Sequence, residues 1–130
     1  MAKEMDKQLV ILDDSEAGSV KITDDVVAVI AAYAATEVDG VAAMAGNVTS
    51  SILSKVGMKN LASGVRVAIE DGVVRIDTAI LVKYGYAIPT VSKKVQDKIK
   101  ASVENMTSLK VTDVNIRIVG IKVNDDGQEA

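Results

Sequence analysis

The sequence of 130 residues contains no cysteine, histidine, phenylalanine or tryptophan, and it has a single proline. Without thiol and imidazole groups the chain cannot build thiolate or imidazole metal sites, cysteine or histidine nucleophiles, or Ser-His-acid triads. Any catalysis would rest on carboxylates, lysine, tyrosine or hydroxyl groups. The absence of cysteine also removes any disulfide framework and fits a reducing compartment. Composition therefore argues against most enzyme classes.

The chain also lacks an excess of positive charge and a long apolar run. Its formal net charge is −3, whereas a dedicated nucleic-acid binder needs basic side chains to neutralise phosphates. The uncharged stretch over residues 26–36 is shorter than the about 20 residues that span a bilayer. Acids and lysines interleave over residues 1–14, which is not the pattern of a secretion signal. We expect a soluble, cytoplasmic protein with no nucleic-acid partner and no direct membrane insertion.

Motifs for phosphate and metal binding are missing as well. The sequence has no GxxxxGK[ST] or GxGxxG loop and no EF-hand spacing. Adjacent carboxylate pairs stand at residues 13–14, 24–25 and 125–126. The first and last pairs fall in the expected flexible ends, and the middle pair begins a helix, where the dipole favours acids. We predict no metal, no cofactor and no enzymatic activity.

The chain does contain enough apolar material for one core. Hydrophobic residues make up 48% of the sequence, and a chain of this length corresponds to a single domain. We predict a flexible leader over residues 1–17, one α+β domain over residues 18–123, and a frayed acidic tail over residues 124–130.

The domain should begin with a strand over residues 18–22 and a helix over residues 24–38. Thr23 is placed to cap this helix, and Gly40 to end it. One side is broadly apolar, with Val26, Val27, Ile30, Tyr33, Ala34 and Val38. Much of the rest is covered by alanines, namely Ala28, Ala31, Ala32 and Ala35. Such a helix is covered on two sides. We favour a sheet and a second helix; the alternative is that the alanine side is a self-association face.

Residues 64–84 give the clearest local pattern. Two alternating strands flank an Asp-Gly pair, which a two-residue hairpin turn prefers. This turn fixes a register that places Arg66 opposite Asp77, so that opposite charges meet across the strands. Because the second strand is longer than the first, its later inward positions, up to Tyr84, need another partner.

Residues 111–123 supply the candidate partner strand. The inward set changes around Gly120 from Val114, Ile116 and Ile118 to Val119, Ile121 and Val123, and a β-bulge would explain this change of phase. Residues 40–46 fit a short strand or a turn, and residues 47–59 fit a short helix. Together these elements predict an α+β fold with a small mixed or antiparallel sheet packed against two main helices.

The second main helix is predicted over residues 89–106, opened by Pro89. Its inward stripe consists of Val91, Val95, Ile99, Val103 and Met106. Two lysine–acid pairs stand four residues apart on the outer face, Lys93 with Asp97 and Lys100 with Glu104. Only Lys94 and Lys98 remain unpaired along this helix. We therefore favour a solvated mixed-charge face over a basic binding patch.

Two of the three tyrosines, Tyr84 and Tyr86, stand at the joint between the hairpin and this helix. Alternation predicts that Tyr84 is the last inward residue of its strand. Gly85 permits a turn, after which Tyr86 has no evident structural role. We expect Tyr86 to be exposed and better placed for a partner than for a substrate.

Several short motifs follow one another in a characteristic order over residues 18–123. They are Gly18 before a strand, Glu37-Val38-Asp39-Gly40-Val41, Gly64-Val65, Tyr84-Gly85, Ile88-Pro89, Val95-Gln96, Asn105-Met106-Thr107 and Val114-Asn115-Ile116. Together they resemble the alkaline-shock, or envelope-stress-response, family of Gram-positive-type bacteria. The resemblance implies a small cytoplasmic α+β protein with no known catalytic activity and no established catalytic, metal or cofactor residues. It also implies self-assembly in some members, attachment to the membrane through an anchoring partner protein in some, and a link to fatty-acid synthesis in others.

Our leading hypothesis is a non-enzymatic scaffold or regulatory protein of the envelope stress response that acts through protein contacts and forms a homo-oligomer. The candidate interaction surfaces are the edge strands and the residues Tyr84, Tyr86, Lys94, Lys98, Ala28, Ala31, Ala32 and Ala35. One alternative is a module that binds RNA or anionic lipid through the lysines of helix 89–106, and another is a regulator of fatty-acid synthesis. A third hypothesis is a small enzyme that uses Tyr84 with a lysine or a carboxylate.

Overall fold

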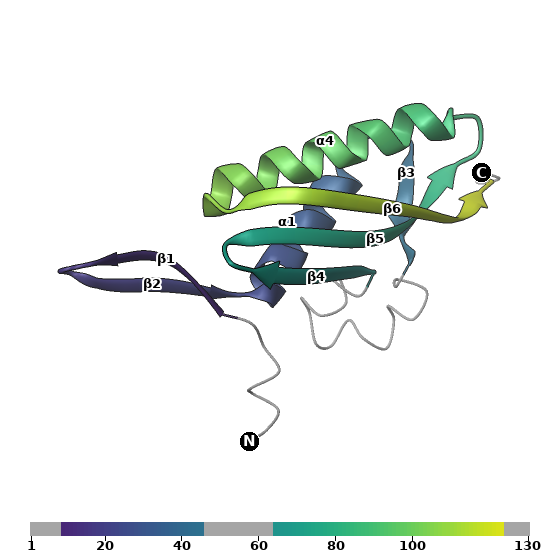
Figure 1. Cartoon of the computed structure of the whole chain (residues 1–130). Coiled ribbons are helices and arrows are strands. Elements are labelled where there is room, and N and C mark those ends of the chain that lie inside the picture. The colour runs from purple at the N-terminus through teal and green to yellow at the C-terminus, as the bar shows by residue number, and fades with distance from the viewer. Residues whose placement is uncertain (1–8, 46–63, 124–130) are drawn as a thin grey trace, which may run out of the picture.

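The computed structural model of the protein describes residues 9–45 and 64–123 and confirms an α+β fold (Figure 1). The elements are β1 Leu9–Ser15, β2 Gly18–Thr23, α1 Asp24–Thr36, β3 Val41–Met44, β4 Val65–Glu70, β5 Val73–Lys83, α4 Ile88–Thr107 and β6 Lys110–Lys122. The short strand, the hairpin, both main helices and the last strand therefore lie where the sequence predicted them. The helix predicted over residues 47–59 and the tail predicted over residues 124–130 lie outside the described residues.

Strand β1 lies where the sequence predicted part of a flexible leader. It pairs antiparallel with β2 through a tight turn, so that Ser15 is opposite Gly18 and Leu9 is opposite Thr23. The prediction was wrong over residues 9–15, because a short apolar run mixed with charges indicates little until its partner strand is known. This hairpin projects from the rest of the protein (Figure 1).

Strand β5 is the centre of the main sheet. On one edge it pairs antiparallel with β4 along its first half and with β3 near its end. On the other edge it pairs with β6 in parallel along its whole length. The predicted hairpin register is confirmed, with Arg66 opposite Asp77. A parallel pair needs a crossover connection, which α4 supplies, and the sheet is therefore mixed.

The bulge predicted near Gly120 is confirmed. The register of β5 and β6 shifts so that Leu81 lies opposite Gly120, which leaves Val119 as the extra residue. Alternation predicted that Val119, Ile121 and Val123 would face inward, but all three are exposed. The prediction was wrong there because, among the described strands, β6 pairs with β5 alone, so the end of this edge strand is left uncovered.

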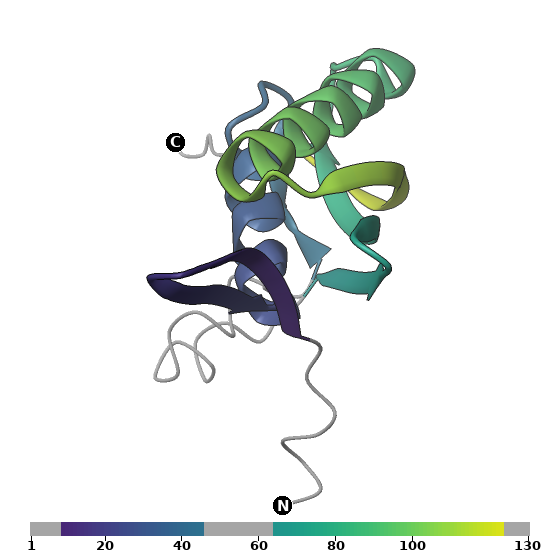
Figure 2. The ribbon, with the colours of Figure 1, turned by 60° about the vertical axis from the view of Figure 1, so that its left-hand side comes forward.

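Helices α1 and α4 pack against the main sheet and against each other (Figure 2). The inward stripe of α4 is confirmed at four positions, Val91, Val95, Ile99 and Val103. Met106 was predicted inward but is 68% exposed. The stripe continues instead to Thr107, which is buried and whose hydroxyl donates to the Val103 carbonyl at 2.6 Å and accepts from the Leu109 N–H at 3.1 Å.

The alanines of α1 lie inside the protein. Ala28, Ala31, Ala32 and Ala35 are all buried, whereas Val26 and Tyr33, which were predicted on the apolar inner side, are exposed. The helix contacts α4 as well as β3 and β4, and small side chains allow such close approach. These alanines were therefore wrongly predicted as an interaction surface. The favoured alternative is confirmed, since the main sheet and helix α4 cover α1.

Candidate functional site: the strand–helix corner and the edge of β6

The corner where β5 ends and α4 begins holds Tyr84, one of the predicted interaction residues. Tyr84 was predicted to face inward, but it is 72% exposed. Its N–H donates to the Lys122 carbonyl at 2.9 Å, so the backbone still follows the sheet. The side chain does not, because β5 ends at Lys83 and Gly85 turns the chain with a φ of 99°. The exposed ring of Tyr84 is therefore available to a partner.

The other corner tyrosine, Tyr86, has a structural role that the sequence did not reveal. Its ring packs against Gly40, where an added Cβ would lie 2.8 Å from Tyr86 Cδ2 and 2.7 Å from Val91 Cγ2. Gly40 has a φ of 102°, which favours glycine. Tyr86 is still 46% exposed, so its expected exposure is confirmed in part. In the sequence, Gly40 was the sign that another group could approach the backbone there. The sequence could not show that this group is Tyr86, because the two residues are far apart in the chain and meet only in the folded protein.

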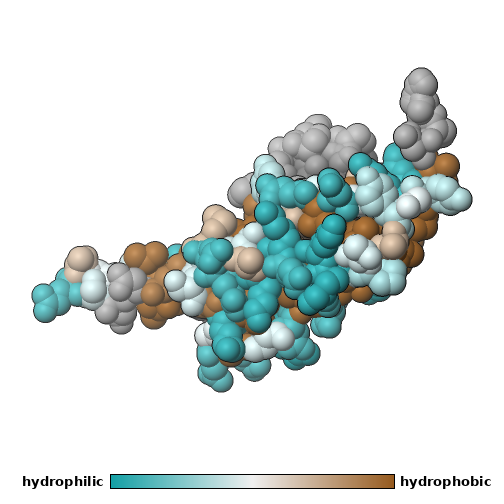
Figure 3. All heavy atoms as spheres, turned by 90° about the horizontal axis from the view of Figure 1, so that it is seen from above, coloured by the Kyte–Doolittle hydropathy of each residue, from teal (hydrophilic) through white to brown (hydrophobic). Residues whose placement is uncertain are grey.

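Further exposed apolar residues stand on the two segments that meet at this corner, the start of α4 and the end of β6. We call this set the corner patch, and it consists of Tyr84, Tyr86, Ile88, Val119, Ile121 and Val123. The bulge brings the β6 residues into it, because Ile121 is opposite Val82 and Lys122 is bonded to Tyr84. Figure 3 shows hydrophilic side chains over the middle of the view and hydrophobic ones at its right-hand end, where β5 and β6 finish. Exposed apolar patches of this kind mark interaction sites.

The outer edge of β6 is covered by α4 along its first part. Glu104 Oε2 accepts the Val111 N–H at 2.9 Å, and Gln96 Nε2 donates to the Val114 carbonyl at 2.9 Å. The predicted pair between Lys100 and Glu104 was wrong, because the carboxylate binds this backbone N–H instead. Beyond Val114, the structure of residues 9–45 and 64–123 shows no hydrogen bond to the outer edge of the strand. The second half of β6 is therefore open to strand pairing.

The lysines of α4 are paired differently from the prediction. Lys93 Nζ lies 3.2 Å from Asp97 Oδ1, as predicted. Lys98 was predicted to be unpaired along the helix, but its Nζ lies 3.5 Å from Oε1 of Glu37, which follows α1. Lys94 has no acidic partner within the described part of the chain. Among the described residues, the lysines of α4 without an acidic partner are therefore Lys94 and Lys100, since Lys93 and Lys98 are paired. Two unpaired cations are little for a phosphate or lipid surface.

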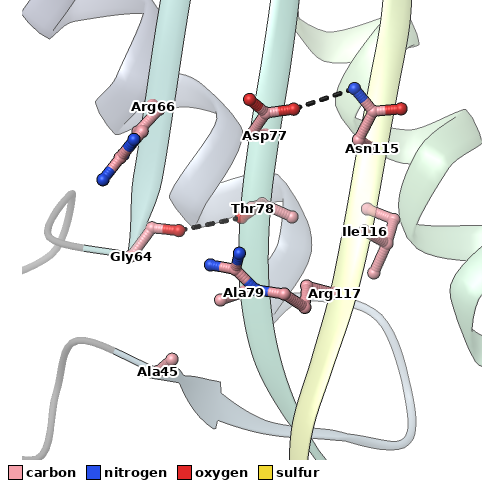
Figure 4. A pocket seen from close by; sticks show the side chains of 9 residues that line it. All are labelled: Ala45, Gly64, Arg66, Asp77, Thr78, Ala79, Asn115, Ile116 and Arg117. Atoms are coloured by element: carbon pink, nitrogen blue, oxygen red, sulfur yellow. Dashed lines mark hydrogen bonds between the residues drawn. The ribbon is translucent and has the colours of Figure 1, made fainter.

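A separate hollow of about 680 Å³ lies on the face of the main sheet that α1 and α4 leave open (Figure 4). It is lined by Ala45, Gly64, Arg66, Asp77, Thr78, Ala79, Asn115, Ile116 and Arg117. Asp77 Oδ1 accepts a hydrogen bond of 2.8 Å from Asn115 Nδ2. No ion pair joins Arg66 to Asp77, although they are opposite in the register. The described residues that line the hollow include neither Tyr84 nor a lysine.

Within residues 9–45 and 64–123, no group of three or more acidic, histidine or cysteine side chains could hold a metal ion. No helix there is long and apolar enough to cross a membrane.

The fold and these surfaces define a small α+β protein with an exposed apolar corner and a partly open sheet edge. The model of the alkaline-shock protein 23 family, described as having a cell envelope-related function, matches residues 13–123. The chain belongs to this family, which confirms the family predicted from the ordered motifs.

Individual relatives agree with this assignment. The chain is 41% identical over 117 residues to the uncharacterized protein YqhY of Bacillus subtilis, covering 90% of this chain and 87% of the relative. It is 32% identical over 110 residues to the uncharacterized protein YloU of the same organism, covering 83% of this chain and 92% of the relative. It is 28% identical over 109 residues to a stress response regulator gls24 homolog of Streptococcus pyogenes, covering 83% of this chain and 61% of the relative.

Proposed function

We propose that this chain is a non-enzymatic protein of the cell-envelope stress response that acts through protein contacts and binds a second copy of itself. The family description and the name of the gls24 relative support the role in envelope stress. The open outer edge of β6 beside the corner patch is the single observation that carries the contact-based function.

The chemistry of this edge favours pairing with another strand. An exposed strand presents a row of unpaired N–H and C=O groups, and another chain can continue the sheet there. Natural edges are usually protected by charge, proline or covering side chains. Here Gln96 and Glu104 protect the first part of β6, while its last part carries the exposed apolar residues Ile121 and Val123. A second copy of the same edge would cover both the backbone groups and these side chains.

Other partners fit the same surface. A membrane-anchoring partner protein would place the chain peripherally at the membrane, and a role in the control of fatty-acid synthesis would require a protein partner as well. Both proposals use the corner patch rather than a catalytic group. Binding of RNA or anionic lipid through α4 is less favoured, because two of its lysines, Lys93 and Lys98, are paired with carboxylates.

Light scattering over a range of protein concentrations tests self-association through β6. The wild-type chain should show a mass above that of a monomer that rises with concentration. Ile121→Lys should return the mass to that of a monomer, because a charge on an edge strand opposes pairing. Ile11→Lys is the matched control, since Ile11 is also exposed but lies on the projecting β1–β2 hairpin.

The two variants separate the possible outcomes. A wild-type chain that stays monomeric at high concentration would refute the proposal. Loss of assembly in Ile11→Lys but not in Ile121→Lys would assign the contact to the hairpin instead of β6.

A further inference from the structure

We propose that the hollow on the face of the main sheet opposite α1 and α4 binds a small molecule with a phosphate or carboxylate group, held between Arg66 and Arg117. This site uses the face of β4, β5 and β6, whereas the proposed self-association uses the outer edge of β6. The failure of one proposal therefore would not contradict the other.

The hollow exists because one row of the sheet carries almost no side-chain volume. Ala79 of β5 donates its N–H to the Gly64 carbonyl at 3.0 Å on one side and lies opposite Arg117 of β6 on the other. Glycine and alanine fill little of the space above this row, and Ala45 adds another small side chain at the margin. The Arg117 side chain, which begins on β6, extends across β5 over Ala79 (Figure 4). The small side chains therefore leave room for a ligand beside the polar groups of the neighbouring strands.

The two arginines of the rim have no acidic partner. In the described residues no carboxylate lies within ion-pair distance of Arg66 or Arg117, whereas Arg75 on β5 lies 3.9 Å from Asp113. A guanidinium group presents its N–H donors in a planar fork that matches the two oxygens of a carboxylate or a phosphate. Arg66 projects from β4 and Arg117 from β6, on either side of the same hollow (Figure 4). An oxyanion between them would be contacted from both sides.

The rim also contains one carboxylate, which refines the class of ligand. Asp77 Oδ1 is engaged by Asn115 Nδ2 at 2.8 Å, and two arginines outnumber this single acid. The local charge therefore remains positive. The other carboxylate oxygen can accept a hydrogen bond from a hydroxyl or amino group of the ligand. The hollow of about 680 Å³ lies within the range of about 300–1,000 Å³ that is usual for small-molecule sites.

Titration of the full chain with inorganic phosphate, and separately with citrate, tests this proposal at low ionic strength. Backbone amide resonances of Arg66, Ala79 and Arg117 should shift and saturate with at least one of the two probes. Arg66→Gln and Arg117→Gln should each weaken binding about tenfold or more, since a charged hydrogen-bond partner is lost. Arg75→Gln is the matched control. It also removes a positive charge from the main sheet, but Arg75 is paired with Asp113.

Asp77→Asn gives a prediction of opposite sign. It keeps the oxygen that Asn115 binds but removes the negative charge from the rim, so anion binding should tighten several-fold. It also provides a readout if an arginine variant fails to fold. Saturation with phosphate or with citrate supports the site and names the anion it prefers. Absence of saturation with both, an equal loss in Arg75→Gln, or weaker binding in Asp77→Asn would overturn it.

Discussion

The ring of Tyr86 lies against the backbone of Gly40, so the turn that begins α4 rests on the turn that ends α1. A second contact joins the same two segments, since the Lys83 N–H donates to the Gly40 carbonyl at 2.8 Å. The absence of a side chain at Gly40 is what permits both turns to meet. A tyrosine that looked free in the sequence therefore fixes how α1 and β3 sit on β5 and α4.

This contact predicts a large effect of Gly40→Ala. The added Cβ meets Tyr86 and Val91 and occupies a backbone conformation with positive φ, so the free energy of unfolding should fall by about 2–4 kcal/mol. Urea denaturation measures this loss. Gly72→Ala is the control, because Gly72 also has positive φ but has no atom within 4 Å of the added Cβ. Equal losses in the two variants would show that backbone strain alone is responsible.

The buried alanines of α1 predict a loss of stability rather than of assembly. Ala32→Leu forces extra volume into a position with 0% exposure and should lower the free energy of unfolding by about 1–3 kcal/mol. Ala101→Leu, on the exposed side of α4, should be nearly neutral. Urea unfolding and light scattering together test this. If Ala32→Leu changed the mass of the protein but not its stability, the alanine side would be an association face after all.

The cover of the β6 edge can be tested at a single amide. Glu104→Ala removes the acceptor of the Val111 N–H and should speed hydrogen exchange at Val111, with a stability loss of about 0.5–1.5 kcal/mol. Glu104→Gln retains an oxygen acceptor and should stay close to the wild type. Unchanged exchange at Val111 in Glu104→Ala would mean that water or another group protects this edge equally well.

The local elements of the fold could be predicted from the sequence because each has a short-range signal. The Asp-Gly turn set the hairpin register, Pro89 opened α4, and the change of phase around Gly120 indicated the bulge. In each case a few neighbouring residues restrict the backbone or the side-chain period. The alternation of inward and outward side chains wrongly predicted that Tyr84 and Ile121 face inward. This pattern holds only while a strand stays regular and one of its faces is covered.

The surfaces were harder to predict because they depend on contacts between distant segments. On α1, Val27 and Ala34 of the predicted apolar side are buried, but Val26 and Tyr33 are exposed and the alanines take the remaining inward positions. The pairing of Lys98 with Glu37 and the use of Glu104 by Val111 join separate elements. The hollow at Arg66 and Arg117 also needs the parallel placement of β6, which the sequence left open.

The position of β5 has a consequence for the order in which the protein folds. Its contact with β4 is local, because the hairpin pairs residues no further apart in the chain than Val65 and Thr78. Its contacts with β6 and with β3 each close a long loop, as in the pairs Lys83–Lys122 and Val41–Val82. Because a long loop costs more entropy to close than a short one, we expect the β4–β5 hairpin to form first. Strands β3 and β6 should then dock later, with lower φ-values in kinetic experiments.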